Sequence, residues 1–382
     1  MKKEIEFKQY PAFINREHEL NFLRNFIQDI PNRLLFIFGP KSSGKTTLLY
    51  KFIEEIEKNP KYDLMFFNLR KMLIVNYSEF IRVFFSATDD SPAGESKRKY
   101  EYDLKVFKLS YESIEKIEKK EYDPFIVMAK ELQKIKMKGK VPIIIIDELQ
   151  ALSDIYFNGQ RELLNELFNF FVAMTKESHL CHVIISSSDG YFIERIYSDS
   201  KLHKTSSFFE VDYLEKEDIF YWLNNLEKES GIRDYILTEK QIEIAWHYFG
   251  GSVWEISELL SNLFLFVKDG AVSDEDIINF CSGKIRAFAI RFLYYKPLKY
   301  DSDLFIAFNE VLKKKESVLT KDLMTLNSSF KKDDLINELG NLVQKNLFSY
   351  NPVTGVYKPQ GHSIQLGLEL YCKEYAINWK SK

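Results

Sequence analysis

Cysteine is scarce in this chain of 382 residues, which contains three in total, at positions 181, 281 and 372. Three thiols that lie far apart in the sequence are typical of a reducing compartment rather than of a disulfide-bonded secreted protein. The N-terminal stretch MKKEIEFKQYPAF lacks the apolar core and the small-residue cleavage site of a secretory signal. No run approaches the ~20 consecutive apolar residues that a membrane-spanning helix needs. We therefore expect a cytoplasmic protein that has no membrane partner.

An excess of positive charge is also missing, because 53 Lys and Arg residues face 56 Asp and Glu residues and leave a net charge of −3. This balance argues against a generally basic protein that coats nucleic acid. A local basic patch stays compatible with it, since the field depends on where the charges lie. Apolar residues make up 45% of the chain and charged residues 29%, as in soluble globular proteins. The length exceeds one ordinary hydrophobic core and predicts two or three domains.

The stretch FIFGPKSSGKTTLL fits the pattern G-x-x-x-x-G-K-[ST] without a gap, through Gly39, Gly44, Lys45 and Thr46. The apolar residues 34–38 predict a buried strand, and a helix is expected to begin near Lys45. The two glycines allow the backbone to curl so that successive N–H groups point at phosphate oxygens. The helix adds the positive end of its dipole. The stretch therefore predicts a loop that binds a nucleoside triphosphate; the alternative is a chance match in a glycine turn.

The side chains that follow the second glycine have separate roles in such a loop. Lys45 would reach the β- and γ-phosphates, Thr46 would bind Mg²⁺, and the Thr47 hydroxyl would lie close to the α-phosphate. The candidate nucleotide-binding residues of the loop are Gly39, Pro40, Lys41, Ser42, Ser43, Gly44, Lys45, Thr46 and Thr47.

A second apolar run, VPIIIIDELQ (141–150), ends in two carboxylates. It is too apolar for an edge strand, so we expect a central strand whose tip carries Asp147, a ligand for Mg²⁺ together with Thr46. Glu148 is then placed to orient and activate the water that attacks the γ-phosphate, which makes it the candidate catalytic base. The alternative is that the two carboxylates cap the following helix.

A third apolar run, CHVIISSSDG (181–190), ends in three serines. In phosphate-loop ATPases of the additional-strand class, a strand between the loop strand and the acidic strand carries a polar residue that senses the γ-phosphate. We assign this role to Ser187, with Ser186 and Ser188 as less favoured candidates. Because Ser-Asp-Gly sequences also form turns, an ordinary turn is the alternative interpretation.

Six stretches together resemble the archaeal ATPase family within the STAND branch of the AAA+-related ATPases. They are FINRE (13–17), GPKSSGKT (39–46), FFNLRKM (66–72), IIIIDELQAL (143–152), VIISSSDGYF (183–192) and FGGSVWEI (249–256). The resemblance implies a three-layer α/β P-loop NTPase core of the additional-strand class with sheet order 5-1-4-3-2, followed by a helical lid domain and a winged-helix domain. It also implies ATP and Mg²⁺ as cofactors and an ATPase that acts as a nucleotide-driven conformational switch.

The resemblance extends to residues outside the loop. An N-terminal segment lies against the adenine in this family, so Asn15 and Arg16 become candidates for that pocket; for Arg16 a solvated helix start is the alternative. The glycine–glycine–x–proline motif of the lid is matched by residues 250–252, but Val253 stands where proline would. No clear arginine finger follows the third apolar run, and Arg195 is a weak candidate. We therefore expect hydrolysis to be slow or to depend on a protein partner that supplies the missing charge.

We predict three domains: a P-loop ATPase core over 1–212 with a surface insertion at about 86–123, a helical lid domain over 213–298, and a winged-helix-like domain over 299–382. Alternation of strand and helix patterns predicts the parallel sheet of the core, with strands at 34–38, 64–68, 143–146, 183–186 and 208–212. Within the insertion, the alternation Tyr100, Tyr102, Leu104, Val106 suggests a strand or hairpin that packs back on the domain. One long helix is expected over 156–175.

Only helices and one hairpin are expected after residue 212. The lid helices are predicted at 215–226, 239–248, 254–267 and 274–281, and a bridging helix at 285–295. The last domain is predicted to consist of helices at 303–314, 320–326 and 331–345 and a hairpin at 347–358. Three helices followed by a hairpin indicate a winged helix.

The charges of the last domain argue against DNA as its main partner. From residue 301 to 382 there are 11 Lys and Arg against 10 Asp and Glu. On the presumed recognition helix we expect Asp333, Asp334 and Glu338 on or near the exposed surface, where carboxylates oppose phosphates. We therefore favour protein contacts or interdomain regulation, with duplex DNA as the alternative partner of residues 299–382. The corresponding alternatives for the whole chain are a DNA-associated ATPase, similar to origin-recognition or transposition helpers, and an ATP-locked scaffold with negligible turnover.

Overall fold

The structure is a computed structural model that describes residues 8–87, 107–153, 155–157, 161–295 and 300–376. The chain forms two compact units. The first, which we call the sheet unit, consists of Glu17–Phe38 and Lys45–Glu210. The second, the helical unit, consists of Met1–Arg16, Gly39–Gly44 and Val211–Lys382. The phosphate loop thus groups with the helical unit, although the strand before it and the helix after it belong to the sheet unit.

The sheet unit contains five parallel strands in the order β2-β5-β8-β1-β9. Their bounds are β1 Leu34–Phe38, β2 Tyr62–Asn68, β5 Val141–Asp147, β8 His182–Ser186 and β9 Ser206–Glu210. Numbered along the chain within this sheet and read from β9, the order is 5-1-4-3-2. The prediction of a parallel α/β sheet is confirmed. The last strand ends two residues earlier than predicted, at Glu210 instead of residue 212.

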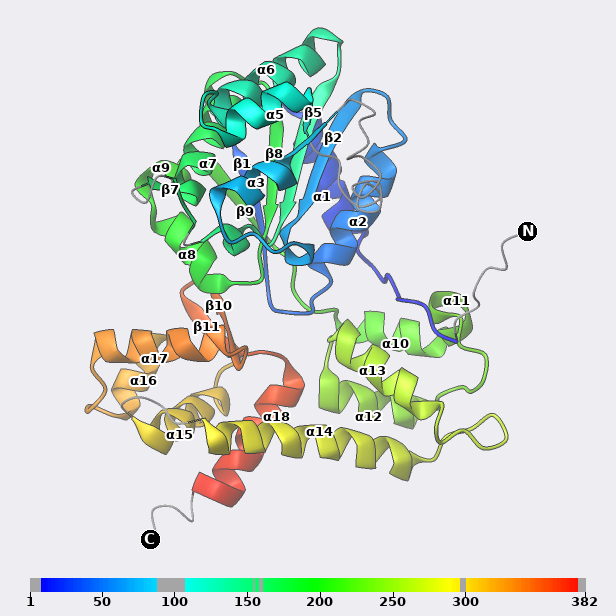
Figure 1. Ribbon diagram of the computed structural model, residues 1–382. Helices are drawn as coiled ribbons and strands as arrows, with labels where there is room; N and C mark the ends of the chain where they lie inside the picture. The colour runs from blue at the N-terminus through cyan, green and yellow to red at the C-terminus, as the bar shows by residue number, and fades with distance from the viewer. Residues whose placement is uncertain (1–7, 88–106, 154, 158–160, 296–299, 377–382) are drawn as a thin grey trace. The chain divides into compact units, whose positions relative to one another are not determined.

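Both faces of this sheet are covered by helices (Figure 1). On one face Phe36, Phe67 and Ile146 join a single apolar cluster with the helices that follow β2, β5 and β8. Their neighbours in the strands, such as Leu35 and Ile145, are fully buried on the opposite face, because side chains alternate along a strand. The helices of the unit are α1 Glu17–Gln28, α2 Lys45–Ile56, α3 Tyr77–Phe84, α5 Tyr111–Glu118, α6 Pro124–Met137, α7 Leu163–Val172, α8 Gly190–Ser198 and α9 Ser200–His203.

Two parts of the sheet unit differ from the prediction. The long helix expected over 156–175 is shorter, because β6 Tyr156–Phe157 and β7 Arg161–Glu162 form an antiparallel hairpin before α7 begins. In the insertion, β3 Phe85–Ala87 and β4 Phe107–Leu109 pair in parallel. The alternating residues 100–106 predicted as a strand or hairpin lie outside the described residues.

After β9, the helical unit contains a group of helices. They are α10 Lys216–Asn224, α11 Leu226–Ser230, α12 Glu239–Phe249, α13 Val253–Leu263 and α14 Asp274–Tyr294. Local signals fix where they begin: Thr238 and Gln241 form a capping box at α12, and the Ser252 side chain accepts from the Glu255 N–H at α13. The helices predicted at 274–281 and 285–295 are one continuous helix, which runs through Gly283 without a break.

The C-terminal part contains the predicted three helices and hairpin. These are α15 Asp301–Leu312, α16 Thr320–Leu326, α17 Lys332–Gln344, β10 Phe348–Asn351 and β11 Val356–Pro359. A backbone bridge between Val318 and Tyr357 adds a third extended segment to the hairpin. A final helix, α18 His362–Tyr371, follows. Within the described ranges, no helix has both the length and the apolar character that crossing a membrane requires.

The expected exposure of Glu338 on α17 is wrong. Its side chain is buried, at 2% exposure, whereas Asp333 is exposed and Asp334 half-buried. Leu335 and Leu342, three residues before and four residues after Glu338, are fully buried, as is the adjacent Leu339. Residues at this spacing share a helix face, so Glu338 is on the inward side of the helix. The acidic surface of this helix is therefore smaller than the sequence suggests.

Candidate functional site

The loop Gly39–Gly44 joins the end of β1 directly to the start of α2. Three of its residues have positive φ angles: Gly39 at 148°, Ser42 at 65° and Gly44 at 92°. The signs of φ alternate from Ser42 to Gly44, an arrangement that turns successive N–H groups toward the same side, as in an anion-binding nest. Pro40 and Ser43 are buried, while Lys41 and Ser42 are exposed. Positive φ angles at the two glycines and at Ser42 therefore curl the loop backbone.

The outer side of this loop is held by residues of the helical unit. The Arg16 guanidinium donates to the Ser43 carbonyl at 2.9 Å and to the Asp212 carbonyl at 2.7 Å. The Tyr213 hydroxyl donates to the Lys41 carbonyl at 2.9 Å. A Cβ atom on Gly39 would lie 2.2 Å from the Val211 carbonyl oxygen, so the backbone itself packs against this position. Carbonyls that point away from a nest need such donors.

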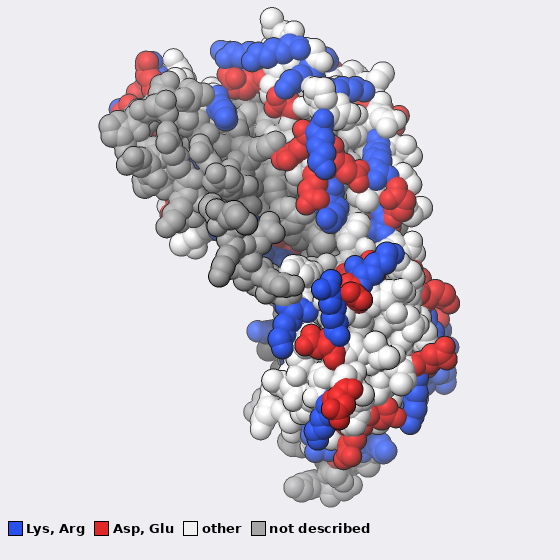
Figure 2. All heavy atoms as spheres, turned by 90° about the vertical axis from the view of Figure 1, so that its right-hand side faces the viewer, with Lys and Arg blue, Asp and Glu red and all other residues white. Residues whose placement is uncertain are grey.

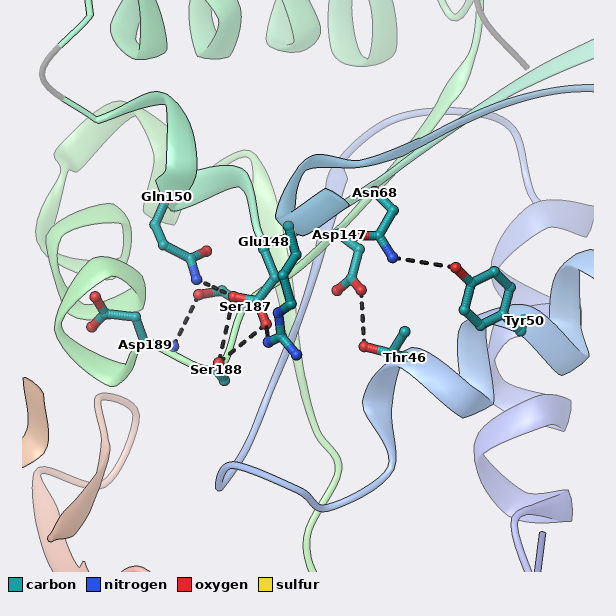
Figure 3. A network of polar contacts seen from close by, with 10 residues as sticks. Thr46, Tyr50, Asn68, Asp147, Glu148, Gln150, Ser187, Ser188 and Asp189 are labelled. Carbon is teal, nitrogen blue, oxygen red and sulfur yellow. Dashed lines mark hydrogen bonds and ion pairs between the residues drawn. The ribbon is translucent and has the colours of Figure 1, made fainter. Parts of the chain in front are cut away.

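The side chains that follow the loop lie at the start of α2 and at the tip of β5. Lys45 is buried, at 6% exposure, Thr46 is half-buried and Thr47 is exposed. The Thr46 hydroxyl donates to Asp147 Oδ2 at 2.9 Å, and Figure 3 shows the two side chains pointing toward one another. Burial raises the pKa of Asp147, and the neighbouring Glu148 raises it further, whereas the hydrogen bond from Thr46 opposes the shift. A cation bound to the Asp147 carboxylate would stabilise its charged form, which burial disfavours.

Glu148 is the most constrained residue at the tip of β5. Its backbone is left-handed, with φ 63° and ψ 48°, a conformation that costs energy for a residue with a side chain. Its side chain is buried and makes no capping bond to the following turn, so the capping interpretation is wrong for Glu148. Its carboxylate instead accepts from Arg70, Gln150 and the Ser188 hydroxyl (Figure 3).

The three serines at the end of β8 are placed differently from one another. Ser186 pairs in register with Asp147 on the neighbouring strand. The Ser187 N–H donates to the Ile37 carbonyl at 3.0 Å, and its hydroxyl accepts from the Asp189 N–H at 3.0 Å. The Ser188 hydroxyl donates to Glu148 at 3.2 Å. The Ser-Asp-Gly stretch does form a turn, in which Asp189 caps α8, and both interpretations of the serines are thus compatible with the geometry.

The predicted residues of the N-terminal segment and the lid lie in the helical unit. Asn15 has a left-handed backbone, with φ 44°, and its amide donates to Asp218 Oδ1 at 2.7 Å. Gly250 ends α12 with φ 53°, and Val253, which replaces the family's proline, is the first residue of α13. Proline is favoured at a first helical position but is not required there. Arg195, the weak finger candidate, pairs with Glu162 and Asn165 instead.

Three residues that contact predicted residues were not themselves predicted. Arg70, in the short helical turn η1 Leu69–Lys71 after β2, forms an ion pair with Glu148. The stretch FFNLRKM contributed to the family resemblance, but nothing in it indicated a partner for Glu148. Tyr213, directly after the core, contacts the loop through a bond that no sequence spacing indicates. Asn68 was likewise unassigned; it pairs in register with Asp147, and its amide donates to Tyr50 at 3.3 Å (Figure 3).

A metal held by protein ligands alone is not found in the described ranges, where no group of three or more His, Cys, Asp and Glu side chains gathers. Thr46 and Asp147 supply one hydroxyl and one carboxylate. Mg²⁺ is commonly held in this way, by one or two protein oxygens together with substrate phosphates and water. The donor set therefore fits Mg²⁺ bound along with a polyphosphate.

Comparisons with known proteins show which family the sequence matches. The sequence model of a family described as "ATPase domain predominantly from Archaea" matches residues 13–259. An uncharacterized ATP-binding protein of Methanocaldococcus jannaschii is 34% identical over 355 residues, covering 92% of this chain and 92% of that protein. An uncharacterized ATP-binding protein of Pyrococcus abyssi is 30% identical over 357 residues, covering 91% of this chain and 95% of that protein.

Among solved structures, the Aeropyrum pernix ORC2 protein in its ADP form is similar with a TM-score of 0.51. The alignment covers all of this chain and 97% of that one, at 12% sequence identity, and so shows similarity of fold alone. Membership in a family rests on the sequence matches, which extend over most of the chain. The chain therefore belongs to the family of ATPase domains found predominantly in Archaea.

Proposed function

We propose that this protein binds Mg·ATP at the loop Gly39–Gly44, hydrolyses it, and uses the nucleotide state to change the conformation of the helical unit. The observation that carries the proposal is the bond between the Thr46 hydroxyl and Asp147 at 2.9 Å, with a buried Glu148 next in sequence. A hydroxyl and a carboxylate converge where the phosphate chain would end, and a second carboxylate stands beside them. The relatives that are named ATP-binding proteins support ATP as the nucleotide.

In this proposal the loop and the first turn of α2 hold the triphosphate. The nest of N–H groups and the positive end of the α2 dipole bind the phosphate oxygens, and Lys45 neutralises the β- and γ-phosphates. Thr46 and Asp147 would hold Mg²⁺, which when bound stabilises the charge that develops on the phosphate oxygens. Thr47 stays assigned to the α-phosphate, and Asn15 and Arg16 to the region of the adenine.

Glu148 would act as the base that takes a proton from the attacking water. Its carboxylate is held by Arg70 and Ser188, so its orientation is fixed before substrate binds. Ser187 remains the proposed sensor of the γ-phosphate. Its hydroxyl oxygen accepts from the Asp189 N–H, which leaves the hydroxyl proton to be donated to a phosphate oxygen.

We also propose the finer architecture that the family resemblance implies. The order β9-β1-β8-β5-β2, with β8 between the loop strand and the acidic strand, fits the additional-strand class. The sequence α15, α16, α17 and the β10–β11 hairpin fits a winged helix, and α10–α14 fit a lid. The core over 1–212, the lid over 213–298 and the winged helix over 299–382 stay our proposed domains, and a protein partner stays our proposed trigger.

The proposal is tested by measuring Mg·ATP binding and single-turnover phosphate release with the purified full chain. Lys45→Ala should lose both, because the triphosphate loses its buried cation. Glu148→Gln should bind ATP with an affinity within about threefold of wild type. Its phosphate release should fall by about a hundredfold or more, as expected when a general base is removed.

Glu162→Gln is the matched control, because Glu162 is a carboxylate of the same unit that pairs with Arg195. It should leave binding and release unchanged. Wild-type rates in Glu148→Gln would show that the base is assigned wrongly. Binding without any release in the wild type would favour the ATP-locked scaffold, and absence of binding would refute the proposed function.

A further inference from the structure

The carbonyl groups of the phosphate loop are held from outside by two side chains. A loop that turns its N–H groups toward one centre turns its carbonyls outward, and each outward carbonyl needs a donor to keep that orientation. The Pro40 carbonyl is satisfied inside the loop by the Ser43 N–H at 3.3 Å. The carbonyls of Ser43 and Lys41 accept from Arg16 and Tyr213. The shape of the loop thus depends on these two residues of the helical unit.

Arg16 and Tyr213 differ in what else they contact. Arg16 bridges the loop to the Asp212 carbonyl, two residues after the end of β9. Tyr213 lies against the start of α18: a Cβ atom on Gly361 would be 3.5 Å from the Tyr213 hydroxyl and 3.6 Å from Glu255 Oε2. Gly361 has a φ of 99°, so a residue without a side chain is suited to the backbone conformation at this position.

The junction behind Tyr213 is polar and buried. Glu255 of α13 is buried at 8% exposure, and the Ser363 hydroxyl of α18 donates to its Oε1 at 2.5 Å. Burial raises the pKa of Glu255 and of Tyr213, and for Tyr213 the charge of Glu255 adds to the rise. Beside this pair, His362 packs on Trp246 with ring centroids 5.6 Å apart. The first residues of α18 are therefore fixed against α12 and α13 by specific contacts.

We propose that Tyr213 is a positioning residue that couples the shape of the phosphate loop to the junction between α13 and α18. This inference rests on the proposed function, because it assigns a control of nucleotide affinity to the same loop. The Tyr213 hydroxyl orients the Lys41 carbonyl, and the same hydroxyl lies close to Gly361. A displacement of the start of α18 therefore loosens the loop, and by thermodynamic reciprocity a bound nucleotide stabilises the junction.

The test is hydrogen–deuterium exchange of the peptide that covers residues 39–46, measured on the full chain without nucleotide. Tyr213→Phe removes one hydroxyl and keeps the ring. We expect about three- to tenfold faster exchange in this peptide, the range that corresponds to loss of one hydrogen bond. The KM for ATP should rise by a similar factor while kcat stays within about twofold, because the variant changes binding and leaves Glu148 in place.

Tyr235→Phe is the matched control, because the Tyr235 hydroxyl donates to a backbone carbonyl, that of Leu260, at 2.7 Å inside the same unit. It should leave exchange of the loop and KM at wild-type values. Equal effects of the two variants, or wild-type exchange in Tyr213→Phe, would overturn the inference.

A double-mutant comparison tests the coupling to α18. Ser363→Ala removes the donor to Glu255 and should also accelerate exchange at residues 39–46. In a Tyr213→Phe background the same substitution should have little further effect, because the connection is already broken. Fully additive effects would overturn the coupling. If the wild type binds no Mg·ATP at all, the proposed function fails, while the exchange measurements still decide the inference.

Discussion

Arg70 and Glu148 are 78 positions apart in the chain and form an ion pair at the tip of the sheet. The Arg70 side chain is largely exposed and the Glu148 side chain is buried, so the arginine reaches in from the surface to a fixed carboxylate. A charge-assisted bond from a planar guanidinium restricts the orientation of a carboxylate more than a single hydroxyl does. We therefore regard Arg70 as a residue that orients the proposed base.

Arg70→Met should lower single-turnover phosphate release by about ten- to a hundredfold, the usual effect of removing a group that orients a functional side chain. The affinity for Mg·ATP should stay within about threefold, because no contact of the loop or of Thr46 is changed. Arg195→Met is the control, since Arg195 is an arginine of the same unit paired with Glu162. Equal losses in the two variants would contradict the assigned role and would revive Arg195 as a catalytic arginine.

His182 of β8 makes the stability of the sheet unit depend on pH. Its side chain is 1% exposed, and burial lowers the pKa of His182 to about 4, from 6.5 in an exposed histidine. Below pH 6.5 His182 is protonated in the unfolded chain, whereas in the folded chain it stays neutral down to about pH 4. The folded state therefore loses stability as the pH falls through this window. Between pH 7.5 and pH 5.0 the loss from this one group is about 2 kcal/mol.

This prediction is measured by urea unfolding followed by circular dichroism. All four tryptophans lie at positions 222, 246, 254 and 379, outside the sheet unit, so their fluorescence does not report on it. His182→Leu should reduce the change in the free energy of unfolding between pH 7.5 and pH 5.0 by about 2 kcal/mol. His203→Gln, at an exposed histidine of the same unit, should not change it. An unchanged pH dependence in His182→Leu would contradict the prediction.

At the scale of elements, the turn between α12 and α13 depends on close backbone packing. A Cβ atom on Gly251 would lie 1.9 Å from the Leu214 carbonyl oxygen and 2.6 Å from the Leu214 nitrogen. These are backbone atoms, which cannot move aside as a flexible side chain can. The Leu214 N–H also donates to the Gly251 carbonyl at 3.2 Å, so the two segments are joined at the same point.

Gly251→Ala should therefore destabilise the helical unit by about 2 kcal/mol or more, the cost typical of overpacking a rigid contact. Gly283→Ala should do the opposite. Gly283 lies inside α14 with nothing within 4 Å of its Cβ position, and replacing glycine by alanine in a helix stabilises it by about 0.5–1 kcal/mol. Tryptophan fluorescence during urea unfolding measures both, because Trp222, Trp246 and Trp254 belong to this unit. Stabilisation by both alanines would contradict the packing argument.

At the scale of the whole molecule, the described surface that faces the viewer in Figure 2 carries mixed rather than segregated charges. The face drawn in Figure 2 has Lys and Arg side chains interspersed with Asp and Glu. Surface pairs such as Arg24 with Glu55, at 2.8 Å, and Lys216 with Glu243, at 2.9 Å, neutralise each other. A protein that binds duplex DNA instead gathers positive charge where the phosphates lie. Burial of Glu338 removes one carboxylate from the surface of α17, yet Asp333 remains exposed there.

We therefore expect the full chain to bind a 20-base-pair duplex weakly, with a dissociation constant above about 10 μM at 50 mM salt and a shallow salt dependence. Fluorescence anisotropy between 50 and 200 mM salt measures both quantities. Lys331→Ala should then change the affinity by less than about twofold. Tight binding would contradict this expectation if the logarithm of the binding constant fell with the logarithm of the salt concentration with a slope of six or more. That result would favour the DNA-associated ATPase.

The sequence by itself determined the features that depend on neighbours along the chain. The spacing of Gly39 and Gly44 predicts a loop whose backbone curls, the apolar run before Asp147 specifies a central strand, and Thr238 with Gln241 specifies where α12 begins. These signals are local, so they were predictable without coordinates. The length of α14 and the start of α7 were not, because helix ends there depend on packing rather than on a breaking residue.

Only the tertiary structure decided which side chains meet. Arg70 with Glu148, Tyr213 with Lys41, and Ser363 with Glu255 are each joined across long stretches of chain by the way strands and helices pack. Glu338 is buried for the same reason, since the face that α17 turns inward depends on the neighbours it packs against. Periodicity predicts which residues share a face, and the packing of other elements decides which face is covered.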